Sequence, residues 1–267
     1  MHFSDIVPGP RPGLVTTLLL AVTLTVPTAA HAQVNIESLR RQDAPQGLSG
    51  SLGGDVDITT GNTELVELSA NARLNWTGGA ATTLLIGEGG LGFFSGDRFA
   101  SSGLLHLRRT QWLAERFAVE GFGQLNYDRP LLLDFRALAG AGIRVRIARG
   151  DWGVLGVGSS LMLEKERLDL PLTATHPTET ETLRNSTFVT LRVLGGAGFV
   201  VSSTTYAQPA LSDVLDDIRI IENFSLSASL TDRLALTTTF DLRYDSGPPD
   251  GIAGLDTHLR TGVTFTY

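Results

Sequence analysis

Hydrophobic and polar side chains alternate along most of this chain, and the pattern is clearest in its last stretch, residues 255–267. The odd positions there are apolar residues or threonine, whereas the even positions include Asp256, His258 and Arg260. A β-strand places successive side chains on opposite faces. The pattern therefore predicts a strand with one apolar face and one polar face, ending on the aromatic residue Tyr267.

The same period of two returns in segment after segment upstream. Residues 66–76 give the cleanest example, with apolar even positions set against polar residues such as Glu67 and Arg73. Turns rich in glycine, asparagine or aspartate separate the segments. We predict about twelve strands, most of them at or above the roughly 9–11 residues that cross a bilayer at a tilt.

Three places depart from a clean alternation. The register between residues 82 and 113 is ambiguous, although Glu88 favours outward-facing odd positions. Phe188 falls on a polar face, and Glu222 falls on an apolar face.

The predicted connections sort by length to the two ends of the strands. The short ones fall at 77–80, 114–116, 148–151, 195–198 and 231–233, on the side of the C-terminus. The longer ones fall at 95–101, 167–183, 208–215 and 246–254, on the other side, where the tight turn at 60–63 is an exception. Short periplasmic turns and longer outer loops are typical of transmembrane β-barrels, and a soluble sandwich has no reason to sort its loops in this way. We therefore predict an all-β fold, a closed antiparallel transmembrane β-barrel.

Aromatic residues gather at the predicted strand ends. One group contains Trp76, Trp112, Trp152 and Tyr267, and the other contains Tyr127, Tyr206 and Tyr244. Such groups are typical of the two interfacial girdles of a membrane protein. The general preference of aromatic residues for sheets explains part of the pattern as well.

The N-terminus predicts export. Arg11 precedes an apolar run at 14–26, and Ala30-His31-Ala32 forms a small-residue cleavage site. We predict a signal peptide at 1–32, a periplasmic leader at 33–47, and an outer-membrane barrel at 48–267. The expected location is the outer membrane of a bacterial cell.

Composition narrows the class of partners. The net charge is −7, which argues against a nucleic-acid partner. Cysteine is absent, so disulfides do not hold this exported chain together, and a closed barrel with internally satisfied backbone bonds suits it. The expected partners are outer-membrane lipid and the barrel-assembly machinery, and we expect a monomer.

Three sequence blocks resemble an uncharacterised family. They are S-G-S-L-G-G-D-V-D-I-T-T-G-N-T near the start, F-R-A-L-A-G-A-G-I-R-V in the middle, and L-R-Y-D-S-G-P-P-D-G-I-A-G-L-D-T-H-L-R-T-G-V-T-F at the end. Members of this family are named as salt-induced outer membrane proteins. The resemblance implies an outer-membrane barrel and implies no reaction, ligand or catalytic residue.

The polar faces predict which residues line the lumen. The candidates are Arg73, Arg136, Arg144, Arg146, Arg192, Glu120, Asp241, Arg243, Asp256 and His258. Both charge signs occur in near-equal number, which predicts weak ion selectivity. Val263, Phe265 and Tyr267 are the candidate assembly signal of the last strand.

No catalytic, cofactor or metal site is predicted. His106, His176 and His258 follow the expected signal, and none has a nucleophile at a recognisable spacing. Asp55 and Asp57 share a strand face and are interpreted as lumen lining. We predict a non-enzymatic envelope protein, either a narrow channel or a protein of osmotic and salt-stress adaptation. The alternative is an outer-membrane enzyme that modifies lipid.

Overall fold

The structure is a computed structural model that describes residues 46–61, 64–231 and 234–265. The predicted signal peptide, nearly all of the predicted leader, and Tyr267 lie outside these residues. The described chain forms β1 (Gly47–Thr59), β2 (Leu65–Gly78), β3 (Ala81–Phe94), β4 (Asp97–Trp112), β5 (Phe117–Asp128), β6 (Leu133–Gly150), β7 (Gly153–Leu168), β8 (Glu179–Leu194), β9 (Phe199–Pro209), β10 (Ile218–Ser229), β11 (Leu234–Asp245) and β12 (Leu255–Phe265). Two single 3-10 turns, η1 (Arg129–Leu131) and η2 (Gly196–Gly198), interrupt the connections. No helix in the described ranges has the length and apolar character needed to cross a membrane.

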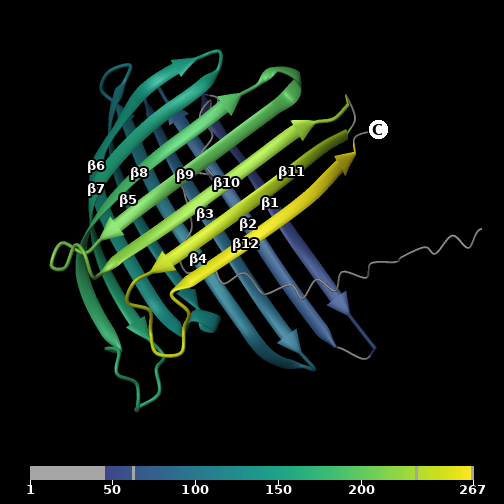
Figure 1. Cartoon of the computed structure of the whole chain (residues 1–267), viewed down its shortest axis with the longest axis vertical. Coiled ribbons are helices and arrows are strands. Elements are labelled where there is room, and N and C mark those ends of the chain that lie inside the picture. Colours follow the sequence, from purple (N-terminus) through teal and green to yellow (C-terminus); the bar gives the residue numbers. More distant parts are fainter. Residues whose placement is uncertain (1–45, 62–63, 232–233, 266–267) are drawn as a thin grey trace, which may run out of the picture.

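The twelve strands form one sheet in which every strand pairs antiparallel with the next one along the chain (Figure 1). The predicted all-β fold and the number of strands are thus confirmed. Within the described residues no backbone pairing joins β1 to β12, so the sheet is open at this seam. The closed barrel remains a prediction.

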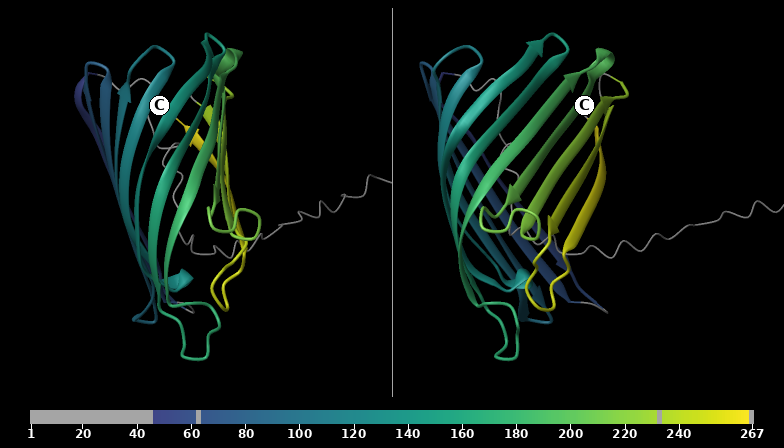
Figure 2. Two further views of the ribbon diagram at one scale, coloured as in Figure 1. Left: turned by 90° about the vertical axis from the view of Figure 1, so that its left-hand side faces the viewer. Right: turned by 60° about the vertical axis from the view of Figure 1, so that its left-hand side comes forward.

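The sheet is strongly curved, as Figure 2 shows. The strands of its two halves lie on opposite sides of the molecule, with β6 to β8 between them. Contacts on the concave side require this curvature, because Arg219 on β10 reaches Glu164 on β7 across two intervening strands. We call the concave side the inner face and the convex side the outer face.

The two faces differ in polarity in the sense that the alternation predicts. Large apolar side chains are exposed on the outer face, among them Leu105 (50% exposed) and Leu161 (56% exposed). Charged and amide side chains on the inner face are buried, as with Arg136, Glu120 and Glu164. The usual arrangement of a water-soluble protein, with apolar residues inside and charges outside, is therefore reversed.

Small clusters of large apolar side chains also lie on the inner face. Leu84, Ile86 and Leu104 form one buried cluster, which resolves the ambiguous register of β3 with its even positions facing inward. Phe188 and Tyr206 form another, with ring centroids 5.2 Å apart. These apolar clusters lie between the polar side chains of the inner face.

Two members of the predicted aromatic girdles are placed wrongly. Tyr206 is buried on the inner face against Phe188, so it does not face outward. Trp112 shares the face of Arg108 and Thr110, and its ring lies 4.3 Å from the guanidinium carbon of Arg146. The assignment failed because it used the distance to the strand end and ignored on which face each ring lies.

The connections separate into a loop end and a turn end. The loop end of the sheet holds the long connections at 169–178, 210–217 and 246–254. The opposite end, the turn end, holds short connections such as Gly79–Ala80 between β2 and β3. The predicted long connection at 95–101 is wrong, because β4 already begins at Asp97. Ser95 and Gly96 make the turn alone, with φ values of 49° and 86° in the left-handed region that two-residue hairpin turns use.

Candidate functional site

Five charged residues form the main feature of the inner face near the loop end. We call this group the loop-end charge cluster; it contains Arg136 of β6, Glu164 and Glu166 of β7, Arg184 of β8 and Arg219 of β10. All five side chains are at least nine-tenths buried. Their positions follow from alternation, since Glu164 and Glu166 are two residues apart and share one strand face.

Arg219 connects most of the cluster. Its Nη1 donates to both carboxylate oxygens of Glu164 at 2.6 and 2.7 Å, and its Nη2 donates to Glu166 at 3.0 Å. Its Nε donates to Asp245 of β11 at 2.8 Å. One guanidinium thus joins β7, β10 and β11 across the concave side, a role for which its planar set of donors is suited.

The other two arginines of the cluster also pair with the buried carboxylates of Glu164 and Glu166. Arg136 donates to Glu166 at 2.5 Å, and Arg184 donates to Glu164 at 3.1 Å. Arg184 also forms a two-pronged contact with Asp217, at 2.7 and 3.1 Å. Every buried carboxylate of the cluster therefore has cationic donors, as buried charges require.

A second network lies on the inner faces of β4, β5 and β6. Glu120 accepts hydrogen bonds from Thr110 at 2.8 Å and from Nε of Arg144 at 2.8 Å, and it pairs with Arg108 at 3.4 Å. The guanidinium of Arg144 also lies 4.6 Å from the ring centroid of Phe188 on β8. This network ties β4, β5 and β6 together and extends to β8.

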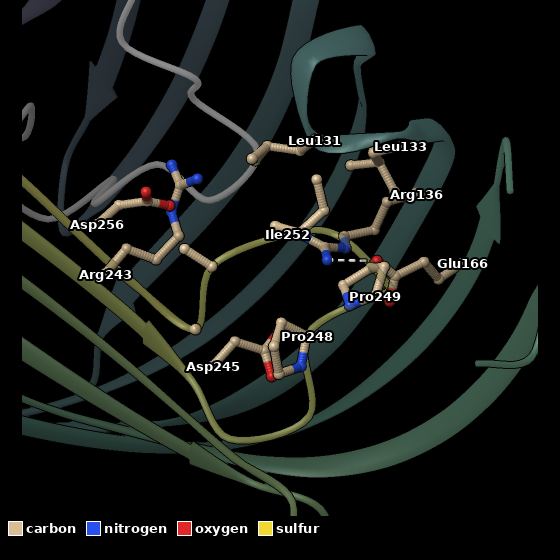
Figure 3. Close-up of a pocket in the computed structure, with 12 residues that line it drawn as sticks. Leu131, Leu133, Arg136, Glu166, Arg243, Asp245, Pro248, Pro249, Ile252 and Asp256 are labelled. Atoms are coloured by element: carbon tan, nitrogen blue, oxygen red, sulfur yellow. Dashed lines mark hydrogen bonds and ion pairs between the residues drawn. The ribbon is translucent and has the colours of Figure 1, made fainter. Parts of the chain in front are cut away.

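A small cavity lies beside the loop-end charge cluster (Figure 3). Its volume is about 40 Å³, which leaves room for a few water molecules. Pro248, Pro249 and Ile252 of the loop at 246–254 face Leu131 and Leu133 across it. Arg136, Glu166, Arg243, Asp245 and Asp256 complete its lining. The loop therefore folds over the loop end of the inner face and narrows it.

The predicted lumen-lining residues lie in several different environments. Arg136, Arg144 and Glu120 lie in the buried networks, and Arg243 and Asp256 line the cavity. Near the turn end, Arg146 is half-buried, and Arg192 is exposed. Arg73 is half-buried on β2. Asp241 accepts a hydrogen bond from Asn223 and lies 4.0 Å from Nδ1 of His258, its register partner.

Two members of the networks were missed from the sequence. Arg184 lies just after the predicted loop at 167–183 and before the predicted strand, whereas β8 begins at Glu179 and thus earlier than expected. Its even position, shared with Ser186 and Thr190, was the available signal. Arg108 was not among the predicted lumen-lining residues, and its pairing with Glu120 needed the register of β4 against β5.

The three histidines form no catalytic set in the described part of the chain. His106 is buried, and its Nδ1 lies 3.0 Å from Gln124. His176 lies in an exposed loop, and His258 faces Asp241. The described residues also contain no group of three or more side chains that could hold a metal ion.

Two connections at the loop end are joined by the exposed carboxylate of Asp250. It accepts hydrogen bonds from the backbone N–H groups of Thr175 and His176, both at 2.7 Å, and from the hydroxyl of Thr175 at 2.9 Å. The loop at 169–178 thereby holds the loop at 246–254, which covers the cavity. We call this contact the Asp250 contact.

The Asp250 contact should persist into acid. The hydrogen bond from the His176 backbone, together with those from Thr175, lowers the pKa of Asp250 below its ordinary value of about 3.9. A carboxylate with a lowered pKa stabilises its contact above the ordinary pKa, and the contact is lost as the pH falls through the lowered value. In an NMR titration, the His176 amide should therefore shift with a midpoint below about 3.9. A midpoint at or above that value would contradict the assignment, and Asp250→Asn should abolish the transition.

Comparison with known proteins yields one match. A family model described as "Protein of unknown function, DUF481" matches residues 51–267. No curated protein and no solved structure matches the chain. The predicted resemblance to an uncharacterised family is confirmed in this form, and the part of it that concerns salt induction and the outer membrane stays a prediction.

Proposed function

The chain belongs to the DUF481 family of proteins of unknown function, and we propose that it is an outer-membrane β-barrel protein without catalytic activity. It acts either as a narrow, weakly selective channel or as a closed barrel that adapts the envelope to osmotic and salt stress. An exported precursor and assembly through the last strand belong to the same proposal.

One observation carries this proposal: the sheet is apolar on its convex face and charged on its concave face. Leu105, Leu107, Leu125, Leu161 and Leu163 are all between 47% and 56% exposed. Water would disfavour such a surface, whereas hydrocarbon accepts it. The buried inner charges meanwhile form ion pairs with one another on the concave side, away from this apolar surface.

A membrane environment would also require the sheet to close into a barrel. β1 and β12 each leave one edge without a strand partner in the described structure. A bilayer core offers no water to such an edge, so the spanning sheets found in membranes are closed. Pairing of β12 with β1 would complete the barrel, in keeping with the proposed role of Val263, Phe265 and Tyr267 in assembly.

The buried networks argue for a narrow passage. The loop-end charge cluster and the loop at 246–254 occupy the loop end, and the Glu120 network occupies the inner face between them and the turn end. Both charge signs are present in each network, which favours weak ion selectivity.

Shortening the loop at 246–254 should open this passage. Removing residues 248–252 withdraws Pro248, Pro249 and Ile252 from the cavity, so we expect a clear rise in single-channel conductance in planar bilayers. The matched control removes residues 213–215 from the neighbouring loop, where Leu215 is 87% exposed and lines no part of the cavity. Equal conductance of the two variants would contradict the assigned constriction, and large selective currents from the unmodified protein would contradict a narrow lumen.

A lipid-modifying enzyme is the competing proposal. It requires a nucleophile beside a base, and none of the contacts described for His106, His176 and His258 supplies one. Incubation of the folded protein with labelled phospholipid separates the two: we expect no turnover, and sustained turnover would favour the enzyme.

A further inference from the structure

One carboxylate lies on the apolar outer face. Glu222 of β10 is half-buried between the outward-facing residues Ile220 and Phe224. Its carboxylate accepts hydrogen bonds from Ser203, at 2.7 Å, and from Thr205, both on β9. No basic side chain of the described residues forms an ion pair with it. A charge on a lipid-facing surface is costly, and such residues normally face protein or water.

A cluster of hydrogen-bonding groups lies on the same outer face, on the other side of β9. Asn185 donates to the hydroxyl of Ser159 at 3.0 Å, and Thr187 donates to the amide oxygen of Asn185 at 2.6 Å. These residues belong to β7 and β8. The amide nitrogen of Asn185 carries two hydrogens, and the described residues provide an acceptor for only one of them.

The strand registers place the two groups on either flank of β9. Glu222 pairs with Thr205, and Thr205 pairs with Val189 on β8. Thr187 and Asn185 lie two and four residues from Val189 toward the loop end. A twofold axis along the membrane normal and over β9 would bring the acceptor flank of one copy against the donor flank of the other.

We propose that this surface, formed by Ser159, Asn185 and Thr187 on one flank and Ser203, Thr205 and Glu222 on the other, is a homodimer interface within the membrane. Each Glu222 accepts a hydrogen bond from the amide of Asn185 in the second copy. The occupant is a second copy because the chain itself carries both complementary halves, as a twofold interface requires. Exposed Leu161, Leu183 and Val189 supply apolar contact beside the polar groups. This inference rests on the proposed membrane location and replaces the expected monomer with a dimer.

A single engineered thiol tests the interface. Ala207 lies on β9 between the two flanks, where it pairs with Thr187 on one side and Ile220 on the other. The chain has no cysteine of its own. Oxidation of membranes from cells that express the full chain with Ala207→Cys should yield a disulfide-linked dimer. Leu105→Cys, equally lipid-facing but on β4, should yield none.

Two further substitutions test the recognition itself. Glu222→Leu or Asn185→Leu, each combined with Ala207→Cys, should lower the yield of linked dimer about threefold to tenfold. This range corresponds to the loss of one or two hydrogen bonds between protein surfaces in a membrane, taken from the values measured between transmembrane helices. Unchanged yield in both would overturn the inference, as would a linked product with a different protein in place of the second copy.

The fold of each variant is read on the same gel. A variant that changes mobility on boiling is a folded barrel, so absence of the linked dimer in that case refutes the interface and leaves the proposed function standing. Absence of the mobility change in the unmodified protein refutes the proposed function itself.

Discussion

Replacing Arg219 by alanine should destabilise the protein by about 3–5 kcal/mol, because it removes one partner from a buried network and leaves carboxylates with fewer donors. Arg219 donates to Glu164, Glu166 and Asp245, and its side chain is 7% exposed. The loss should appear as a large fall in the urea concentration at the unfolding midpoint, followed by tryptophan fluorescence in lipid vesicles.

Arg167→Ala is the matched control. Arg167 also forms a short ion pair, with Asp134 at 2.6 Å, but the two side chains are 56% and 49% exposed. Exposed pairs contribute about 0–1 kcal/mol. Similar midpoints for the two variants would contradict the view that the loop-end charge cluster holds β7, β10 and β11 together.

The alternation of side chains allowed the two faces of the sheet to be predicted, because a period of two is a local property of an extended chain. The order of the strands was equally accessible, since consecutive strands joined by short turns pair with each other. Glu120, Arg136 and Arg144, which the alternation placed on a polar face, are buried on the concave side of the sheet.

The alternation of side chains did not predict where the strands begin and end, or which distant residues contact each other. The start of β4 at Asp97 depends on the left-handed conformation of Ser95. Serine seldom adopts this conformation, so the sequence gives no signal for it. The contact of Arg219 with Glu164 depends on the curvature of four successive strands, from β7 to β10. Alternation shows that both residues face inward and leaves open which inward residues meet.

Introducing a charge on the outer face should be far more damaging than introducing one in a loop. Leu105 lies in the middle of β4 on the outer face, and Leu172 lies in the loop at 169–178; they are 50% and 106% exposed. Arginine at the bilayer midplane costs about 2–4 kcal/mol, whereas arginine in water costs little. We therefore expect Leu105→Arg to reduce the folded population in membranes severely and Leu172→Arg to leave it unchanged.

The same comparison separates a membrane protein from a soluble one. In a water-soluble sheet both leucines would contact solvent, and either arginine would be tolerated. Loss of folding by Leu105→Arg alone is thus a property of a sheet whose convex face meets lipid.

The most direct test of this account is the mobility of the protein on a denaturing gel, with and without boiling, after isolation of outer membranes. A closed barrel has no free edge from which to unzip, so it keeps its fold in cold detergent and changes mobility only on boiling. We predict this shift for the unmodified chain and for Leu172→Arg, and a much weaker shifted band for Leu105→Arg. Identical mobility of the unmodified protein under both conditions, together with its recovery in the soluble fraction without detergent, would contradict the account.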